Sequence, residues 1–276
     1  MNALPPELAT HCLAVNEDER LTLGGGQLEF LRTWELLTRF LPPPPAVVLD
    51  VGGATGVYAF PLARAGYDVH LVDALEHHVA TARRRAAGED GPVPVSMAAG
   101  DARRLEHADA SADAVLLLGP LYHLTDRDDR LAALREARRV TRPGGTVAAA
   151  AISRFASTID GLARGYVDEE PFGAMLEGVL ADGVHRNPDP AGRPEWFTTA
   201  YLHRPDELPR ELLDPGLERP RVFAVEGPAW TLPDLAERLA DDARRDHVLE
   251  AVRRIEEEPT IAGASAHLLA FATVPA

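Results

Sequence analysis

The sequence predicts an α/β protein built on a Rossmann-like, doubly wound sheet. Short apolar runs rich in β-branched residues alternate with helical patterns between residues 46 and 152, as in parallel sheets that are buried on both faces. A glycine-rich turn follows the first apolar run and opens a helix, as at the start of a βαβ unit. The 276 residues, 46% of them apolar, supply enough buried surface for one large domain or two small ones.

The first section of the chain ends at four consecutive prolines, Pro42 to Pro45, which no helix or central strand can include. Before them, apolar residues recur at helical spacing from Leu28 to Leu41, and three glycines precede this pattern. We therefore expect an amphipathic helix here. Residues 1–45 are expected to form a helical cover on the domain that follows.

After the prolines, strand and helix patterns alternate. A strand over 46–51, a helix over 58–64 and a strand over 69–73 make a first βαβ unit. The alternation then predicts a helix over 76–87, strands over 93–99 and 114–118, a helix over 130–140, a turn over 142–145 and a strand over 146–152.

The regular alternation stops at Ser153. Aromatic residues are scattered among glycines and prolines in the next section, and we interpret residues 153–204 as an insertion that forms a lid at the sheet edge. Beyond it, the patterns predict a helix over 205–213, a strand over 221–225, helices over 232–258 and a last strand over 267–274. The expected organisation is one domain, 46–276, that contains this lid.

Charge and composition exclude several classes of protein. With 28 basic and 43 acidic side chains the formal charge is −15, and every cation is an arginine. Nucleic-acid binding, which concentrates cations on one face, is therefore not expected. Cys12 is the one cysteine, so neither an intrachain disulfide nor a cysteine metal cluster can form. The histidines show no ligand spacing, and we expect no metal.

The N-terminus does not resemble a signal peptide, because it lacks a basic start followed by an apolar run. No apolar stretch approaches the roughly 18 to 20 residues that span a bilayer. We expect a cytoplasmic protein without a membrane partner.

The first glycine turn, Asp50 to Gly56, is a candidate nucleotide site. Glycines after a strand let the backbone approach a ligand closely, and the next helix offers unpaired N–H groups. A tight strand-to-helix turn without a ligand is the alternative. Asp73 ends the second strand, where a carboxylate can accept both hydroxyls of a ribose; alternatively it is the N-cap of the helix that starts near Ala74.

These positions, with two later ones, resemble class I methyltransferases that use S-adenosylmethionine. The turn has their Asp-x-Gly-x-Gly-x-Gly form, with Ala54 at the middle glycine. Asp73 follows as the second motif, and Gly100-Asp101-Ala102 as the third. The fourth is Leu118-Gly119-Pro120-Leu121-Tyr122-His123-Leu124, leading to Arg142-Pro143-Gly144-Gly145.

This resemblance implies S-adenosylmethionine as methyl donor and S-adenosylhomocysteine as product. It implies a seven-stranded, mostly parallel sheet whose last strand is antiparallel. It places Asp73 on the ribose and Asp101 on the adenine amino group. Ala54 puts in doubt only a backbone position with positive φ. The implied cofactor-binding residues are Arg32, Asp50, Gly52, Gly53, Ala54, Gly56, Asp73, Asp101, Ala102, Leu118 and Gly119.

Arg32 lies on the predicted N-terminal helix, which resembles the cover over the methionine end of the cofactor in related enzymes. A guanidinium there could pair with the cofactor carboxylate. An exposed helix arginine is the alternative.

Tyr122 and His123 are the candidate catalytic residues, because open α/β sheets bind ligands where their strands end. His123 could take a proton near neutral pH, whereas Tyr122 would shape the pocket. Alternatively, His123 is a structural residue beneath the cofactor or the cap of the helix near Thr125.

The lid is expected to select the methyl acceptor. Aromatic side chains pack well on planar or cationic molecules, which favours a small organic acceptor. Filling the core of the lid itself is the alternative for each aromatic residue. The candidate acceptor residues are Arg154, Tyr166, Trp196, Phe197, Tyr201 and His203.

The predicted function is methyl transfer by in-line displacement onto a small organic acceptor. We expect a specialised metabolite that is methylated on oxygen, nitrogen or an electron-rich indole carbon. The layout loosely resembles bacterial indole C3-methyltransferases. An NAD-dependent oxidoreductase is the alternative enzyme class, and the motifs after the third strand and at 142–145 argue against it. A non-catalytic S-adenosylmethionine-binding regulator is the non-enzymatic alternative. The sequence does not set the oligomeric state.

Overall fold

The computed structural model describes residues 17–276, whose strands form a nine-stranded sheet. The strand order is β3-β2-β1-β4-β5-β7-β6, and β9 pairs with both β5 and β8. The predicted α/β class with a mostly parallel sheet is confirmed. Cys12 and the start of the chain lie outside the described residues. In the described part, no helix combines the length and apolar character needed to cross a membrane.

The strands follow the predicted order, with two additions. Their bounds are β1 Val47–Val51, β2 Asp68–Asp73, β3 Ser96–Ala99, β4 Ala112–Leu117, β5 Thr141–Ser153, β6 Val184–His185, β7 Ala200–His203, β8 Glu218–Ala224 and β9 His267–Thr273. The helices are α2 Glu17–Thr22, α3 Gly26–Phe40, α4 Ala59–Arg64, α5 Glu76–Ala87, α6 Pro120–His123, α7 Arg127–Val140, α8 Ala156–Arg164, α9 Glu170–Asp182, α10 Glu207–Leu213, α11 Leu235–Ala240 and α12 Asp242–Arg253. Short 3₁₀ turns complete them: η1 Tyr166–Asp168, η2 Pro194–Trp196, η3 Gly227–Thr231 and η4 Ala262–Ala264.

The chain divides into two compact units. Unit 1 comprises the described part of 1–35 with 151–208 and 222–269, and unit 2 comprises 36–150, 209–221 and 270–276. The predicted cover, domain and lid boundaries stay predictions.

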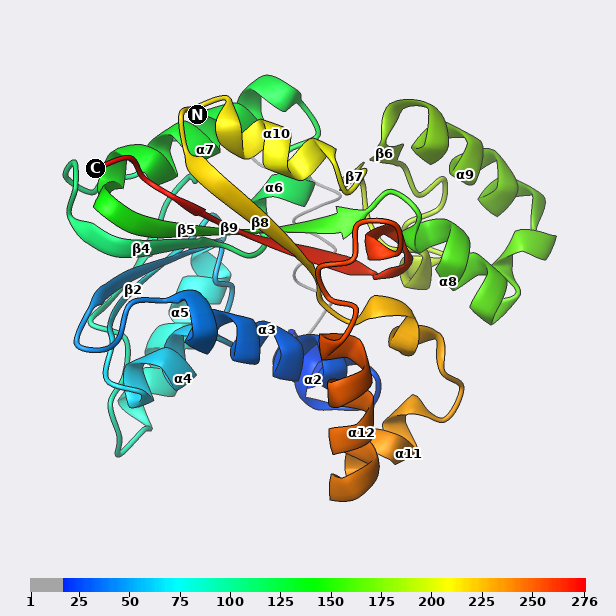
Figure 1. Ribbon diagram of the computed structural model, residues 1–276, viewed down its shortest axis with the longest axis horizontal. Coiled ribbons are helices and arrows are strands. Elements are labelled where there is room, and N and C mark those ends of the chain that lie inside the picture. The colour runs from blue at the N-terminus through cyan, green and yellow to red at the C-terminus, as the bar shows by residue number, and fades with distance from the viewer. Residues whose placement is uncertain (1–16) are drawn as a thin grey trace. The chain divides into compact units, whose positions relative to one another are not determined.

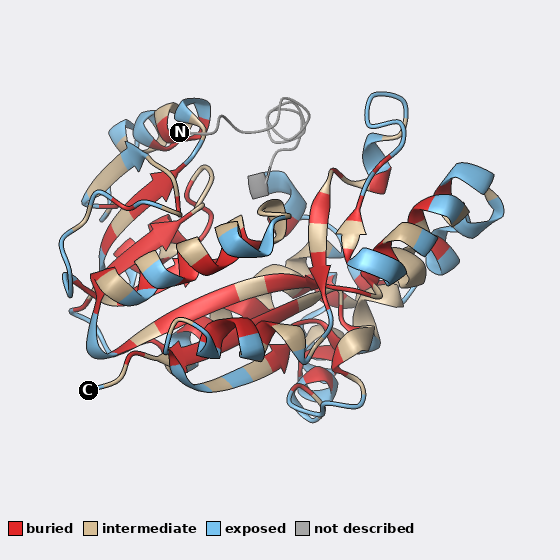
Figure 2. Ribbon diagram, turned by 90° about the horizontal axis from the view of Figure 1, so that it is seen from above, coloured by how far each residue is buried: buried red, intermediate tan, exposed pale blue. Residues whose placement is uncertain are grey.

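The centre of unit 2 is the parallel set β2-β1-β4. Val48 of β1 pairs with Val69 of β2 on one side and with Ala114 of β4 on the other. Helices α4 and α5 lie on one side of these strands and α7 lies on the other (Figure 1), so the strands are buried on both faces (Figure 2). Their carboxyl ends, with Asp50 and Asp73, therefore meet at one edge.

The turn predicted over 142–145 is part of a strand instead. β5 begins at Thr141, and the register between β4 and β5 shifts between Ala112 and Ala114. Gly144 has φ of +77° there, and its N–H donates to the Val274 carbonyl at 2.9 Å. Proline and glycine in a strand often mark such an irregularity, which the sequence pattern presents as a turn.

Strand β9 runs antiparallel to β5, as predicted. The Gly144–Val274 bond lies at one end of the pair, and at the other the Ser153 N–H donates to the Ala266 carbonyl at 2.9 Å. Residue numbers rise along one strand as they fall along the other, which defines the antiparallel sense.

The region interpreted as an irregular lid has regular structure in unit 1. It contains α8, α9 and two short strands, with β7 parallel to β5 through Ile152 and Leu202. Gly165 and Gly183, with φ of +77° and +84°, follow α8 and α9 directly, as left-handed glycines do at helix ends. The strands have only two and four residues, too few for a detectable alternation.

Unit 1 also has an apolar cluster that joins its N-terminal and C-terminal helices. Leu28 of α3 packs with Leu235 and Leu239 of α11 and with Val248 and Leu249 of α12. The amphipathic pattern around Leu28 is thus explained by a partner distant in sequence.

Candidate active site

The glycine turn after β1 is so closely packed that side chains are excluded. A Cβ atom at Gly52 would lie 2.6 Å from the Pro120 ring, and one at Gly53 would lie 2.5 Å from Oδ2 of Asp50. Gly52 and Gly56 have φ of +73° and +92°, conformations that favour glycine. The turn therefore keeps its backbone uncovered where a ligand would approach.

Ala54 adopts the positive φ that its position requires. Its φ is +48°, and its N–H donates to Oδ2 of Asp73 at 2.9 Å. The alanine thus reproduces the conformation of the missing glycine, at the steric cost that a Cβ atom carries in the left-handed region.

Asp50 is a buried carboxylate without a donor. Its residue is 1% exposed, and neither side-chain oxygen has a hydrogen-bond partner among the described residues. Burial, and then the charge of Asp73, raise the pKa of Asp50 to about 7. An unpaired carboxylate at this depth is unfavourable, so a cationic, hydrogen-bonding ligand would stabilise it.

Asp73 is held from three directions. Oδ2 accepts from Ala54, while Oδ1 accepts from the Leu75 N–H at 2.9 Å and from Nδ1 of His78 at 3.0 Å. The proposed alternative, an N-cap role, is wrong, because the N-cap residue of α5 is Leu75. A carboxylate has about four acceptor sites, so one remains for a ligand hydroxyl.

His78 was missed in the sequence as a site residue. It is buried on α5, five residues after Asp73, and its hydrogen bond fixes the orientation of that carboxylate. An acid at a strand end followed by histidine in the first helical turn is a signal that could have suggested it.

Asp101 follows β3, and its carboxylate accepts several hydrogen bonds from Arg103. Oδ1 accepts from the Arg103 backbone N–H at 2.9 Å, and Oδ2 accepts from Nη2 at 2.7 Å. Arg103 also pairs with Asp129 at 2.8 Å. The hydrogen bonds from Arg103 hold the pKa of Asp101 below its ordinary value. Ala102, beside it, is buried.

The segment after β4 touches the glycine turn. A Cβ atom at Gly119 would lie 3.2 Å from the Gly52 carbonyl oxygen and 3.6 Å from the Tyr122 hydroxyl. The rings of Tyr122 and His123 meet edge to face, with centroids 4.6 Å apart. Unit 2 thus brings Gly119 and the candidate catalytic Tyr122 to the turn, and Leu118 precedes them directly after the last residue of β4.

His123 does not cap the next helix. The N-cap of α7 is Asp126, whose Oδ1 accepts from the Asp128 N–H at 2.7 Å. The capping alternative for His123 is therefore wrong, while its role as a base stays a prediction.

Comparison with known proteins agrees with this geometry. Residues 48–145 match the model of a methyltransferase domain family, and they contain all the motif residues from Asp50 to Gly119. Over these residues the chain is therefore similar to a methyltransferase domain. The match stops before the proposed lid.

Relatives of the methyltransferase domain differ in their acceptors. A ubiquinone/menaquinone biosynthesis C-methyltransferase from Caulobacter sp. (strain K31) is 36% identical over 127 residues, 41% of this chain and 48% of that protein. A ubiquinone biosynthesis O-methyltransferase from Sinorhizobium medicae is 36% identical over 107 residues, 39% of this chain and 41% of that protein. This chain spans about half the length of the curated relatives it matches first.

A solved structure shows the same fold over most of the chain. It is a SAM-dependent methyltransferase from Methanosarcina mazei, with a TM-score of 0.57 and 16% identity, and the match covers 87% of this chain and 97% of the other. At this identity the likeness establishes the fold.

Arg32 lies in unit 1, outside the methyltransferase-domain match. Its guanidinium is fully buried, so the alternative of an exposed helix arginine is wrong. Nη1 donates to Glu35 at 2.6 Å, Nη2 to Glu256 and Nε to the Val225 carbonyl at 3.3 Å. These partners already balance its charge, so a cofactor carboxylate would have to compete with them. Binding of that carboxylate stays a prediction.

Three of the predicted acceptor residues meet in unit 1. Nη2 of Arg154 donates to the Tyr201 hydroxyl at 3.2 Å and to Oε2 of Glu207 at 2.9 Å. The Tyr201 ring lies edge to face with His203, with centroids 4.7 Å apart. Glu207, which the sequence analysis missed, completes a polar group at the ends of β5 and β7, in which Arg154 and His203 are buried and Tyr201 and Glu207 are half-buried.

Tyr166 and Trp196 lie in a different cluster. Both pack with Phe172 of α9, at centroid distances of 5.5 and 5.1 Å, and Trp196 is 4% exposed. This arrangement favours the alternative that these rings fill the core of the lid. Phe197 packs on His185 with centroids 6.3 Å apart.

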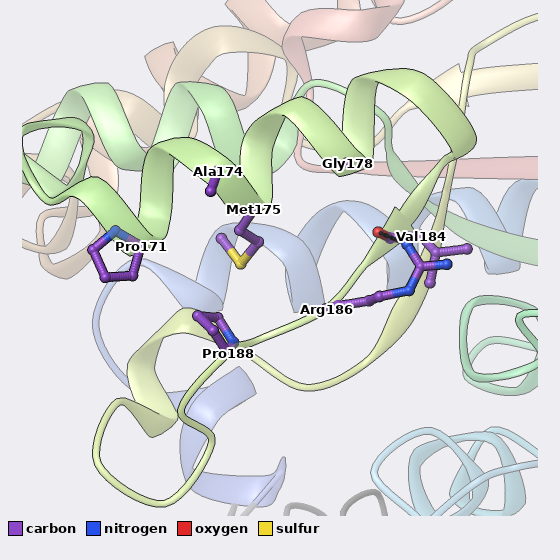
Figure 3. A pocket seen from close by; sticks show the side chains of 7 residues that line it. All are labelled: Pro171, Ala174, Met175, Gly178, Val184, Arg186 and Pro188. Carbon is purple, nitrogen blue, oxygen red and sulfur yellow. Dashed lines mark hydrogen bonds between the residues drawn. The ribbon is translucent and has the colours of Figure 1, made fainter.

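A shallow pocket of about 310 Å³ lies beside this cluster. Figure 3 shows Met175 pointing from α9 toward the segment that carries Arg186 and Pro188. Most lining side chains are apolar, and Arg186 is engaged by Asp182 at 2.9 Å. The pocket therefore presents an apolar wall with little free charge.

One group of possible metal ligands occurs among the described residues. Glu29, Glu226 and His267 of unit 1 bring ligand atoms within 4.8 Å of one another. Nδ1 of His267 donates to Glu226 at 2.5 Å, and Glu226 also accepts from Ser265 at 2.8 Å. Burial would lower the pKa of His267, but the two glutamates raise it to about 9. The raised pKa favours an imidazolium that pairs with the carboxylates, and Glu29 also pairs with Arg20 at 2.6 Å.

Proposed function

We propose that the chain transfers the methyl group of S-adenosylmethionine to a small organic acceptor. The observation that carries this proposal is Asp50, a buried carboxylate without a donor beside a turn that admits no side chain at Gly53. The methionine end of the donor carries an ammonium group, which would supply both the charge and the hydrogen bonds that Asp50 lacks.

The residues around the turn fit the rest of the donor. The remaining acceptor site of Asp73 suits a ribose hydroxyl, and Asp101 suits the adenine amino group. The small residues of the turn let its backbone approach the donor closely: Gly52, Gly53, Ala54 and Gly56. The neighbouring strand ends are lined by Ala102, Leu118 and Gly119. When bound, S-adenosylmethionine supplies a methyl group activated by a positively charged sulfur.

The chain has little covalent chemistry to perform in such a reaction. It needs to align donor and acceptor, exclude water and take a proton from acceptors that carry one. We assign to His123 the role of the base that takes this proton, since imidazole side chains can act as bases near neutral pH. We assign to Tyr122 the role of lining the pocket.

The acceptor is proposed to be a small aromatic or polar molecule. Arg154, Tyr201 and His203 are the residues we assign to it, because they form a polar group with one aromatic face. Tyr166 and Trp196 are proposed to act through the lid core that they build. Relatives named as C- and O-methyltransferases leave carbon, oxygen and nitrogen acceptors open.

Calorimetry tests the donor. We expect S-adenosylmethionine and S-adenosylhomocysteine to bind and NAD not to bind; saturation by NAD alone would overturn the proposal. Asp50→Asn should lower the affinity for S-adenosylhomocysteine by at least about tenfold, because one hydrogen bond to a charged group is lost. Binding of 5′-methylthioadenosine, which has no ammonium group, should be unchanged in that variant.

Asp68→Asn is the matched control, since it makes the same change at the exposed start of β2. The Asp68→Asn variant should bind S-adenosylhomocysteine with the affinity of the unmodified protein. A screen of phenols, amines and indoles for a mass gain of one methyl then identifies the acceptor. Tight donor binding with no methylated product from any class would favour the regulator.

A further inference from the structure

We propose that Arg130 and Glu211 are positioning residues for the segment 120–125, which carries Tyr122 and His123. This inference rests on the proposed function, because it concerns the segment to which we assign the proton transfer. All of these residues belong to unit 2.

Arg130 binds the segment through its backbone. It lies on α7 with 1% exposure, and Nη1 donates to the Leu124 carbonyl at 2.9 Å and to the Thr125 carbonyl at 3.0 Å. These carbonyls follow His123 directly. Helix α6 has only four residues, so it leaves carbonyl groups at its end that need outside donors.

Glu211 fixes the direction of that guanidinium. It lies on α10 with 4% exposure, and it accepts from Nε of Arg130 at 2.9 Å and from Nη2 at 2.7 Å. Two parallel bonds to a planar guanidinium define its orientation. Nη1 is thereby directed at the two carbonyls.

The other end of the segment is held by the glycine turn. Pro120 lies so close to Gly52 that no Cβ atom fits between them, and the Tyr122 hydroxyl lies near Gly119. The segment is therefore fixed at its start by the donor site and at its end by Arg130. A shift of the Arg130 end would move Tyr122 and His123 relative to the turn.

The competing explanation is that the Arg130–Glu211 ion pair only holds α7 and α10 together. Arg127, which also pairs with Glu211, allows the two explanations to be compared. Arg127 also lies on α7 and pairs with Glu211 at 3.8 Å and with Asp214, but its side chain is 54% exposed and its bonds go to carboxylates. Arg127→Gln therefore weakens the contact between α7 and α10, while Arg130 still donates to the two carbonyls.

The test replaces the pair together, because removing one partner would leave a buried charge. Arg130→Met with Glu211→Leu should fold, since apolar residues of similar size often replace buried ion pairs without loss. We expect faster hydrogen exchange at the amides of 121–125, and a shifted His123 imidazole resonance, assigned with His123→Gln. S-adenosylhomocysteine affinity should stay within about threefold, a change smaller than that of one lost hydrogen bond.

Turnover, once the acceptor is known, should fall in kcat by on the order of 100-fold, as for a misplaced catalytic group. Arg130→Lys serves if the double variant does not fold, because one ammonium cannot bind Glu211 in two places and both carbonyls as well. Its 121–125 amides should also exchange faster. Unchanged exchange and unchanged His123 resonances, or the same changes in Arg127→Gln, would overturn the inference.

These readouts require no methyl transfer. A failure of wild-type protein to bind S-adenosylhomocysteine would remove the proposed function, whereas normal binding with wild-type exchange in the variants would remove only this inference.

Discussion

The carboxylates of Asp50 and Asp73 are neighbours in a buried setting, yet only Asp73 has donors around it. The two side chains were both recognisable from their places at the ends of consecutive strands. What the sequence could not show is how differently they are solvated. His78 and Arg103, which hold Asp73 and Asp101, were not recognised, since a short-range motif does not reveal which neighbouring side chain bends back toward it.

The pKa of Asp50 makes donor affinity depend on pH. Since that pKa is raised to about 7, the carboxyl group is neutral below this value and charged above it. An ammonium group binds the charged form, so S-adenosylhomocysteine affinity should rise by about tenfold from pH 6 to pH 8. Calorimetry across this range measures it. Asp50→Asn should remove this rise, and a flat profile for the unmodified protein would contradict the prediction.

Ala54 carries backbone strain that glycine would relieve. Its φ of +48° lies in the left-handed region, so Ala54→Gly should raise the free energy of unfolding by about 0.5–1 kcal/mol after the added freedom of the unfolded chain is counted. Denaturant unfolding measures this change. Ala82→Gly, at a buried position inside α5, should instead destabilise the protein; destabilisation by both would show that Ala54 is not strained.

At the scale of elements, the helices and strands of the alternating region were predicted well, whereas the two short strands β6 and β7 were not. The patterns over 76–87 and 69–73 gave α5 and β2 almost to the residue. β6 and β7 were missed because their formation depends on pairing with each other and with β5. The same reasoning explains the error at 142–145, where a bulged strand has the composition of a turn.

The cluster of Glu29, Glu226 and His267 joins α3, the segment just after β8 and the start of β9. Because the pKa of His267 is raised from 6.5 to about 9, the folded state binds its proton more tightly than the unfolded state. Its stabilisation is therefore complete below pH 6.5 and is lost as the pH rises through 9.

Thermal unfolding between pH 6 and pH 10 tests this cluster. His267→Gln should lower the melting temperature at pH 6.5 and have much less effect at pH 10. His247→Gln changes an exposed histidine of α12 and should leave both values unchanged. An equal loss at both pH values would mean that the histidine contributes by packing alone.

For the whole molecule, the class and the strand sequence followed from alternation and from one glycine turn. The placement of Asp50 and Asp73 at one sheet edge followed too, because a parallel sheet gathers the ends of its strands there. The proposed acceptor residues were harder to group: Arg154, Tyr201 and His203 meet through contacts spanning some fifty positions, while Trp196 packs elsewhere. The periodicity of apolar residues carries no information about side-chain contacts between residues distant in the sequence.

The division into units bears on how this gene could be recombined. The chain passes between the units after residues 35, 150, 208, 221 and 269, and β5, β8 and β9 each contain one of these crossings. A single crossover with a related gene would therefore join fragments of both units and interrupt shared strands. Changes to this protein should therefore be tolerated as point substitutions or within loops, since neither unit is a cassette that can be exchanged whole.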